Sequence, residues 1–191
     1  MNKQVIIIDN YDSFTYNLVH MVEEIIDGEV TVVRNDEFDL VELESYDYII
    51  LSPGPGVPAE AGLLKDVIKV YRTSKKIMGV CLGLQAIGEV YGADLINLQR
   101  VWHGMRTTMT KTAAKSVLLR GVPDSFAAGR YHSWVIDPTS DTSQLVVTAT
   151  DNEGNIMAAR HTKDKVYGVQ FHPESIMTDD GKLMLTNFLN S

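Results

Sequence analysis

Cys81, the single cysteine of this chain, lies in the run GVCLGLQ of residues 79–85. Gly79 and Gly83 stand two residues before and after it, which gives G-x-C-x-G, the thiol counterpart of the G-x-S-x-G nucleophile elbow. Small flanking residues permit a sharp strand-to-helix turn and let a substrate approach closely. Such a turn also places the thiol at a helix N-terminus, where free N–H groups and the helix dipole favour the thiolate. The pattern indicates a cysteine nucleophile, with an inert core cysteine as the alternative.

A second candidate group is the segment Phe171-His172-Pro173-Glu174-Ser175. A nucleophilic thiol needs a base within hydrogen-bond distance, and that base needs an acceptor that orients it. Residues two apart in extended chain point to the same face, so we expect Glu174 to turn back toward His172. Cys81, His172 and Glu174 would supply the three roles. The alternative is a surface histidine beside a solvated glutamate.

The elements that must position these residues alternate between strands and helices in the first half of the chain. Continuous apolar runs predict buried strands at residues 5–8, 30–33, 48–51 and 77–80. Apolar residues at helical spacing predict helices over residues 13–27, around residues 64–71 and directly after Cys81. Asp12 or Ser13 is expected to cap the first helix, and Gly28 to end it.

This alternation predicts an α/β fold, with an open, mostly parallel doubly wound sheet and helices on both of its faces. Residues 10–13, residues 53–56 and Cys81 each follow a strand directly. Sheets of this kind bind ligands beyond the carboxyl ends of their strands. We therefore expect these three segments to converge on one edge of the sheet.

After Gly92 the elements become shorter and more β-prone, which predicts antiparallel strands added to the sheet. The candidate segments are residues 95–98, 105–110, 116–119, 130–132, 145–150 and 156–160, the last two flanking a turn at residues 151–155. A strand at residues 166–171 and a helix at residues 181–189 follow. With no linker or repeat, residues 1–191 are predicted to form a single domain.

The composition narrows the classes of function. The chain has 17 Lys and Arg against 25 Asp and Glu, a formal charge of −8, so we expect neither a nucleic-acid nor a membrane partner. One cysteine forms no internal disulfide, which fits a reducing compartment. Without a signal segment or an apolar run near the ~18 residues of a membrane span, a cytoplasmic location is expected.

The motifs resemble those of a known family. GVCLGLQ, SPGPG at residues 52–56 and QFHPES at residues 170–175 are similar to the three signatures of class I, triad-type glutamine amidotransferases. The resemblance covers essentially the whole chain, with the motifs in the right order. DNYDSFTYN at residues 9–17 is similar to the glutaminase subunits of anthranilate synthase and aminodeoxychorismate synthase.

This resemblance implies roles for particular residues. Cys81 would be the nucleophile, His172 the acid/base and Glu174 its orienter. Backbone N–H groups of Gly54 and Leu82 would form the oxyanion hole, where one donor is worth about 2.7–4 kcal/mol. The residues implied in glutamine binding are Gly54, Pro55, Gly56, Gln85, Ser133 and Trp134. A surface role on the helix for Gln85 and a turn role for Ser133 are the alternatives.

The implied function is hydrolysis of L-glutamine, with ammonia passed to a chorismate-using synthase partner. Anthranilate synthase is the preferred partner; aminodeoxychorismate synthase, or service to both, is the alternative. No cofactor is implied for this chain, and Mg²⁺ is expected only on the synthase. A catalytically silent regulatory module and a stand-alone cysteine hydrolase are more remote alternatives.

Some residues depart from the family pattern or carry no assigned chemistry. Leu84 stands where relatives commonly have His, and Met105 where they commonly have Lys. Leu84 is not expected to affect the triad, whereas Met105 bears on partner contacts. The loop at residues 9–13 is expected to be part capping structure and part docking surface. The other histidines lack metal-ligand spacing and are expected to be structural or at the surface: His20, His103, His132 and His161.

Overall fold

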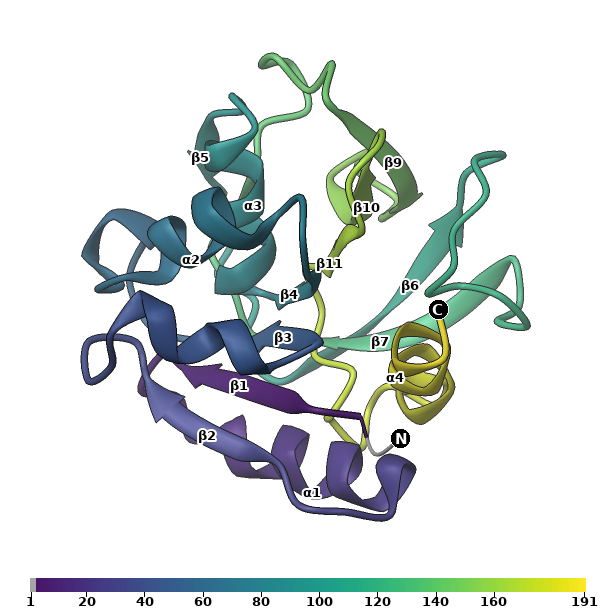
Figure 1. Ribbon diagram of the computed structural model, residues 1–191. Coiled ribbons are helices and arrows are strands. Elements are labelled where there is room, and N and C mark those ends of the chain that lie inside the picture. Colours follow the sequence, from purple (N-terminus) through teal and green to yellow (C-terminus); the bar gives the residue numbers. More distant parts are fainter. Residues whose placement is uncertain (1–2) are drawn as a thin grey trace.

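The computed structural model describes residues 3–191 (Figure 1). Strands and helices alternate as far as α3, and strands dominate from there to the C-terminal helix. The strands are β1 (Val5–Asp9), β2 (Thr31–Arg34), β3 (Tyr48–Leu51), β4 (Lys76–Val80), β5 (Leu95–Asn97), β6 (Met105–Lys111), β7 (Ser125–Arg130), β8 (Trp134–Ile136), β9 (Leu145–Thr150), β10 (Ile156–His161) and β11 (Val166–Val169). The helices are α1 (Thr15–Ile26), α2 (Leu64–Tyr71), α3 (Leu82–Val90) and α4 (Gly181–Leu189), with short 3₁₀ helices at Leu40–Ser45 and Pro58–Glu60. None of the helices described is long and apolar enough to span a membrane.

The strands form one large sheet in the order β2-β1-β3-β4-β11-β10-β9-β6-β7, beside a separate β5-β8 pair. The ladders from β2 to β11 are parallel, and those from β11 to β7 are antiparallel. The predicted α/β sheet with added antiparallel strands is therefore confirmed. Because β4 and β11 are parallel neighbours, the segments that leave their carboxyl ends start side by side.

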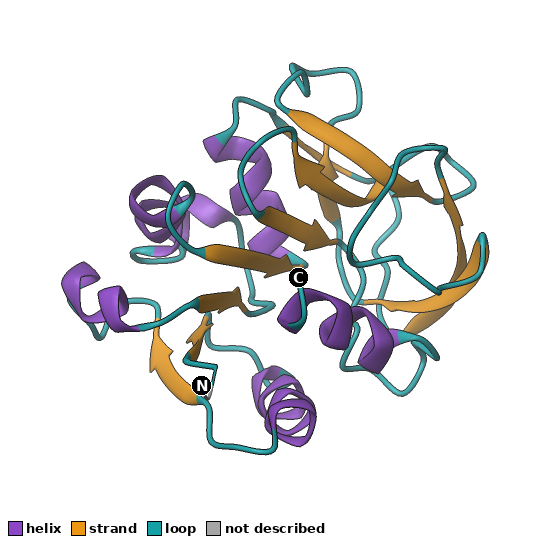
Figure 2. Ribbon diagram, turned by 45° about the vertical axis from the view of Figure 1, so that its right-hand side comes forward, coloured by secondary structure: helices purple, strands orange, loops and turns teal. Residues whose placement is uncertain are grey.

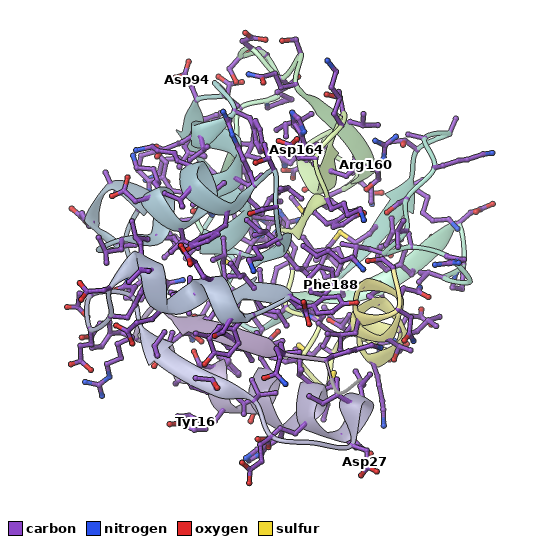
Figure 3. The ribbon with its side chains drawn as sticks, in the orientation of Figure 1. Tyr16, Asp27, Asp94, Arg160, Asp164 and Phe188 are labelled. Carbon is purple, nitrogen blue, oxygen red and sulfur yellow. The ribbon has the colours of Figure 1, made fainter. Side chains whose placement is uncertain are left out.

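Helices cover both faces of the parallel half (Figure 2). Alternate strand residues point to opposite faces, so Ile7 packs with α1 and α4, whereas Ile6 and Ile8 pack with α2 and α3. Phe188 of α4 points into the first of these cores, and Tyr16 and Asp27 of the α1 region lie at the outer surface (Figure 3). The layers hold the strand ends rigidly at one edge.

The start of α1 differs from the prediction. The helix begins at Thr15, its N-cap residue is Phe14, and no side chain caps it. The Asp12 carboxylate instead accepts the Phe14 N–H at 2.8 Å, one residue before the helix, which stabilises the preceding turn. At the C-terminus Asp27 is the C-cap residue and adopts the left-handed conformation, with φ 51°, and Gly28 follows it at the predicted position just beyond the helix.

Three predicted strand segments in the second half also need correction. Residues 116–119 form a turn, because Leu118 and Leu119 are drawn into the core while the turn closes around them. Of residues 130–132 only Arg130 belongs to a strand, β7. The strand predicted at residues 166–171 ends at Val169, since the chain beyond it crosses to β7, where the His172 N–H donates to the Gly129 carbonyl at 3.0 Å.

Candidate active site

Cys81 occupies a sharp turn between β4 and α3. Its φ of 52° and ψ of −103° fall in a region that non-glycine residues rarely adopt and that costs about 1–3 kcal/mol. The Cys81 N–H donates to the Val169 carbonyl of β11 at 2.8 Å, which anchors the turn to the sheet. Such strain persists only where the surroundings impose it, and it commonly marks a functional residue.

The glycines around Cys81 are required by packing. A Cβ atom on Gly79 would lie 2.3 Å from the carbonyl carbon of Gly83, and one on Gly83 would lie 2.6 Å from the carbonyl oxygen of Leu51. Real Cβ atoms do not approach backbone atoms so closely. The G-x-C-x-G spacing therefore lets β4, α3 and β3 meet at the elbow.

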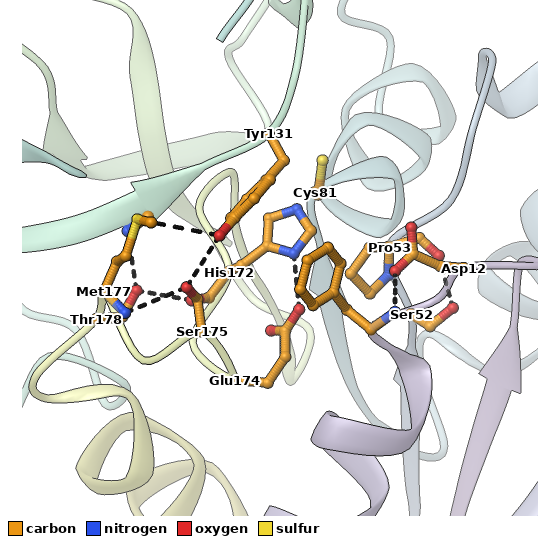
Figure 4. A network of polar contacts seen from close by, with 12 residues as sticks. Asp12, Ser52, Pro53, Cys81, Tyr131, His172, Glu174, Ser175, Met177 and Thr178 are labelled. Carbon is orange, nitrogen blue, oxygen red and sulfur yellow. Dashed lines mark hydrogen bonds and ion pairs between the residues drawn. The ribbon is translucent and has the colours of Figure 1, made fainter. Parts of the chain in front are cut away.

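His172 and Glu174 form a buried pair next to Cys81. Their side chains are 2% and 0% exposed, and His172 Nδ1 lies 2.7 Å from Glu174 Oε1. A turn, and not the extended chain expected from the spacing, brings the two side chains together. In this turn the Ser175 N–H and the Thr178 hydroxyl both donate to the His172 carbonyl, at 3.2 and 2.7 Å. This turn fixes the imidazole with its other nitrogen directed at Cys81 (Figure 4).

The imidazole is poised as a proton-transfer group. Burial works to lower the pKa of His172, but the neighbouring Cys81 thiol and Glu174 carboxylate outweigh it and raise this pKa well above its usual value. Within residues 3–191, His172 Nε2 and Glu174 Oε2 are buried atoms with no hydrogen-bond partner. Unpaired buried polar atoms are rare, and catalysis is one reason for keeping them.

Cys81 lines two neighbouring cavities. The polar cavity, about 130 Å³, is lined by every residue predicted to bind glutamine, together with Tyr131 and His132. The aromatic cavity, about 190 Å³, shares Gly54 and Tyr131 with it. Its other lining residues are Asp12, Ser13, Phe14, Pro53, His103 and His172. The segments expected to converge at the sheet edge thus meet around the sulfur.

Gly54 and Leu82, the expected oxyanion-hole residues, are pressed together. A Cβ on Gly54 would lie 2.5 Å from the Asn10 Cβ and 2.7 Å from the Leu82 Cδ2. Leu82 is the first residue of α3, so its N–H has no acceptor within the helix. Among the residues described, the Gly54 N–H donates no hydrogen bond either. Two free N–H groups therefore belong to adjacent segments beside Cys81.

Asn10 shows what one residue of the loop at residues 9–13 does: it bonds this loop to the neighbouring segments. Its backbone N–H donates to Ser52 Oγ and its side-chain amide to the Ser52 carbonyl, both at 2.8 Å. The Asn35 amide in turn donates to Asn10 Oδ1 at 3.0 Å. These buried bonds hold the start of the Pro53-Gly54 loop. These bonds are not the helix capping expected of this loop, because no side chain caps α1, and docking stays a prediction.

An aromatic cluster around the imidazole was not foreseen. The ring of Tyr131 lies 4.8 Å from that of His172, and the ring of Phe14 lies 5.6 Å from it. Phe14 and Tyr131 also contact each other, with 5.0 Å between their ring centres. They come from the start of α1 and from the segment after β7, and nothing in the local sequence pairs them. The one hint in the sequence was that Tyr131 lies two residues before Ser133, which was predicted to bind glutamine.

Gln170 is a further residue to which the sequence analysis gave no role. It is fully buried, and its side-chain N–H donates to Cys81 Sγ at 3.4 Å. A sequence signal did exist, because Gln170 precedes His172 by two residues and residues two apart share a face of extended chain.

The remaining histidines have varied surroundings. His132 is buried beside Arg130, and burial, together with that positive charge, lowers the pKa of His132 to about 3, which fits a structural role. His161 stacks on Tyr91 with ring centres 4.1 Å apart. His103, by contrast, lines the aromatic cavity. Nowhere in residues 3–191 do three His, Cys, Asp or Glu residues gather as a metal-binding group.

The two residues that depart from the family pattern line neither of the cavities beside Cys81. Leu84 is buried on the far side of the elbow against Gly168, where a Cβ would lie 2.7 Å from the Leu84 Cδ1. Met105 starts β6 and is 41% exposed. Leu84 therefore fills core space, and the effect of Met105 on partner contacts stays a prediction.

A cavity larger than these two lies elsewhere. It measures about 700 Å³ and is lined by the segments around Lys115, Arg160 and Lys163, without any predicted site residue. Size alone would have placed the site there. The smaller cavities are the better candidates, because a strained thiol and an unpaired imidazole nitrogen face them.

Comparison with known proteins gives a consistent result. A family model described as "Glutamine amidotransferase class-I" matches residues 6–191. The "Aminodeoxychorismate/anthranilate synthase component 2" of Bacillus subtilis is 44% identical over 189 residues, which cover 98% of this chain and 96% of that protein. The "Bifunctional protein TrpGD" of Thermotoga maritima is 43% identical over 191 residues, covering 98% of this chain but only 32% of that longer protein.

The fold is also found among solved structures. A glutamine amidotransferase of Thermotoga maritima superposes with a TM-score of 0.76 at 16% identity, covering 100% of this chain and 97% of the other. A Thermoplasma acidophilum protein, described as part of a GMP synthase, superposes with a TM-score of 0.88 at 23% identity, covering 100% of this chain and 94% of the other. At these identities both matches support the fold alone.

Proposed function

The chain belongs to the class I glutamine amidotransferase family, and we propose that it is the glutamine-hydrolysing subunit of a chorismate-using synthase. Anthranilate synthase is the preferred partner. The observation that carries the assignment is the convergence of Cys81, the His172–Glu174 pair and the polar cavity at one sheet edge.

In the proposed reaction the Cys81 thiolate attacks the side-chain amide carbon of L-glutamine. The C–N bond breaks, His172 gives its proton to the departing nitrogen, and ammonia leaves a glutamyl thioester. His172 then takes a proton from a water molecule that attacks the thioester, releasing glutamate and the thiolate. The unpaired Nε2 of His172 is free for both proton transfers, and its raised pKa favours the protonated form that the first transfer needs.

The polar cavity suits the substrate. A free amino acid needs a small pocket with a few placed polar groups, and Gln85, Ser133 and the Gly54–Gly56 loop supply them. The negative charge that develops on the amide oxygen would be stabilised by the N–H groups of Gly54 and Leu82, each worth about 2.7–4 kcal/mol.

The aromatic cavity supports the synthase part of the proposal. Apolar side chains stand out from loops next to its lining residues: Tyr11 is 48% exposed, Val101 68% and Ile176 96%. We infer that these exposed apolar groups belong to the surface on which the synthase docks. A synthase seated there would receive ammonia through the cavity next to the glutamine pocket, with which it shares Cys81.

The test combines this protein with each chorismate-using synthase subunit of its host, with glutamine as the nitrogen source. Anthranilate from one pairing supports the preferred partner, and aminodeoxychorismate alone assigns the chain to the alternative. Both products mean a shared subunit, which the double name of the Bacillus relative makes a specific candidate.

Cys81→Ala is the decisive variant. We expect it to abolish glutamine-dependent synthesis, while synthesis from added ammonia by the partner persists, because only the nucleophile is lost. Full glutamine use by this variant would contradict the proposal. Failure of a glutamine-analogue electrophile to label wild-type Cys81 would instead favour a silent regulatory module.

A further inference from the structure

A continuous line of buried hydrogen bonds leads from Cys81 into the protein. The Gln170 amide donates to Cys81 Sγ at 3.4 Å and accepts from the Gln85 amide at 3.3 Å. Gln85 Nε2 also donates to the Trp134 carbonyl, at 2.9 Å. Gln170 is 0% exposed and Gln85 3%, so water does not compete for these bonds.

The direction of these bonds follows from chemistry. A backbone carbonyl only accepts hydrogen bonds, so the side of Gln85 that faces Trp134 must be its NH₂ group. That same NH₂ group faces Gln170, which must therefore present its oxygen to Gln85. The remaining end of the Gln170 amide, directed at Cys81, is then its NH₂ group. The sulfur receives a donor and no acceptor.

The groups beyond Trp134 give the same direction of hydrogen bonding. An arginine side chain only donates hydrogen bonds, and Arg130 Nε lies 3.1 Å from His132 Nε2. His132 must accept there, which places its proton on Nδ1, 3.1 Å from the Trp134 carbonyl. Arg130 is held in turn by Asp151 at 2.9 Å. A buried ion pair thus locks the carbonyl that orients both amides.

We propose that Gln170 is a further catalytic residue of this site, whose side-chain N–H stabilises the Cys81 thiolate and presents the sulfur to the substrate. The inference rests on the proposed function, in which Cys81 is the nucleophile. The two neighbours of the sulfur then have different roles: His172 exchanges a proton with the reactants, whereas Gln170 only donates a hydrogen bond.

Gln170→Met tests this, because methionine fills a similar volume and has no N–H. Two measurements are made: glutamine turnover, and alkylation by iodoacetamide at pH 7, which reports on Cys81 alone as the chain's one cysteine. Loss of a hydrogen bond to a charged group should lower kcat about tenfold and leave KM within about twofold. Alkylation should slow about threefold, since the lost thiolate is partly offset by higher intrinsic nucleophilicity.

A second variant and a control make the result decisive. Gln170→Glu keeps the size of the side chain and an acceptor for Gln85 but places a carboxylate on the sulfur, so it should slow both reactions more than Gln170→Met. Gln144→Met makes the same chemical change at an exposed residue and should alter neither rate. Melting curves verify that each variant is folded.

Wild-type alkylation and turnover rates in either folded Gln170 variant would overturn the inference. If Gln170→Met unfolds and loses both rates for that reason, the rates of Gln170→Glu test the inference instead. If the wild-type protein hydrolyses no glutamine with any partner, the proposed function fails, whereas the alkylation rates still decide whether Gln170 acts on the sulfur.

Discussion

Two deeply buried ion pairs of the structure differ in how completely their carboxylates are bonded. In the Arg130–Asp151 pair, with side chains 1% and 4% exposed, both carboxylate oxygens are used: Oδ1 accepts the N–H groups of Glu153 and Asn155, and Oδ2 accepts Arg130 and the Asn155 amide. In the His172–Glu174 pair only one oxygen and one ring nitrogen are used.

Their surroundings differ in the same way. The guanidinium of Arg130 stacks on Trp102, with 3.9 Å from its central carbon to the ring centre, and donates to His132. It lines neither of the cavities beside Cys81. His172 instead lines the aromatic cavity next to Cys81. Among the residues described, Arg130 Nη2 also has no hydrogen-bond partner, but it lies outside these cavities. Of the two pairs, the second alone places an unpaired nitrogen beside Cys81, where it can take part in chemistry.

His172→Gln gives the largest expected effect. Removing the acid/base should lower kcat for glutamine hydrolysis by about 10⁴-fold, because neither ammonia departure nor water attack has a proton carrier. The fold should survive, and ammonia-dependent synthesis by the partner should be unchanged. Steady-state kinetics with both nitrogen sources measures this. A loss below about tenfold would remove His172 from the mechanism.

Arg130→Met should act on stability instead. It leaves Asp151 as an unpaired buried charge, which costs about 3–5 kcal/mol of unfolding free energy. Urea denaturation measures the change, and Arg130→Met combined with Asp151→Asn should recover part of it because the stranded charge is gone. A destabilisation under about 1 kcal/mol would mean that the pair contributes specificity rather than stability.

The smallest expected effect is in the pH dependence of stability. Because the pKa of His132 falls from 6.5 to about 3 on folding, acid protonates the unfolded chain first. The unfolding free energy should fall by about 2–3 kcal/mol from pH 6.5 to pH 4.5 through this group. The raised pKa of His172 has the opposite sign: its contribution is complete below pH 6.5 and is lost as the pH rises through the native value.

Urea denaturation of the wild-type protein and of His132→Gln between pH 6.5 and pH 4.5 isolates the contribution of His132. The variant keeps hydrogen-bonding capacity but does not titrate, so its stability should fall less between pH 6.5 and pH 4.5. Parallel pH curves for the two proteins would show that His132 is protonated in the native state, against the neutral form inferred from Arg130.

Much of the fold followed from local patterns. β3 begins and ends at the predicted residues, and the elbow at Cys81 has the predicted strand before it and helix after it. Long apolar runs and helical spacing identify such elements because both faces of the parallel strands are buried. Predictions were weaker past Gly92, where short strands depend on partners distant in sequence; residues 116–119 became a turn for this reason.

The candidate site likewise has a part that local motifs predicted and a part that depends on contacts between distant segments. Cys81, His172 and Glu174 could be proposed from motifs, since each stands next to residues that constrain it locally. Tyr131 and Phe14, which contact the imidazole, could not be paired, because they lie beyond β7 and at the start of α1. Neither could the Arg130–Asp151 pair, whose members belong to β7 and the β9–β10 turn.

By itself the sequence determined the elbow, the alternation of elements and the chemical identity of the thiol, imidazole and carboxylate. These depend on residue types and short spacings, which fix backbone geometry over a few residues. Only the tertiary structure decided which buried pair stays open to a cavity and which amide faces the sulfur. Those outcomes depend on the register of β4 against β11 and on the crossing of the chain to β7, where contacts between distant residues set the position of every polar atom.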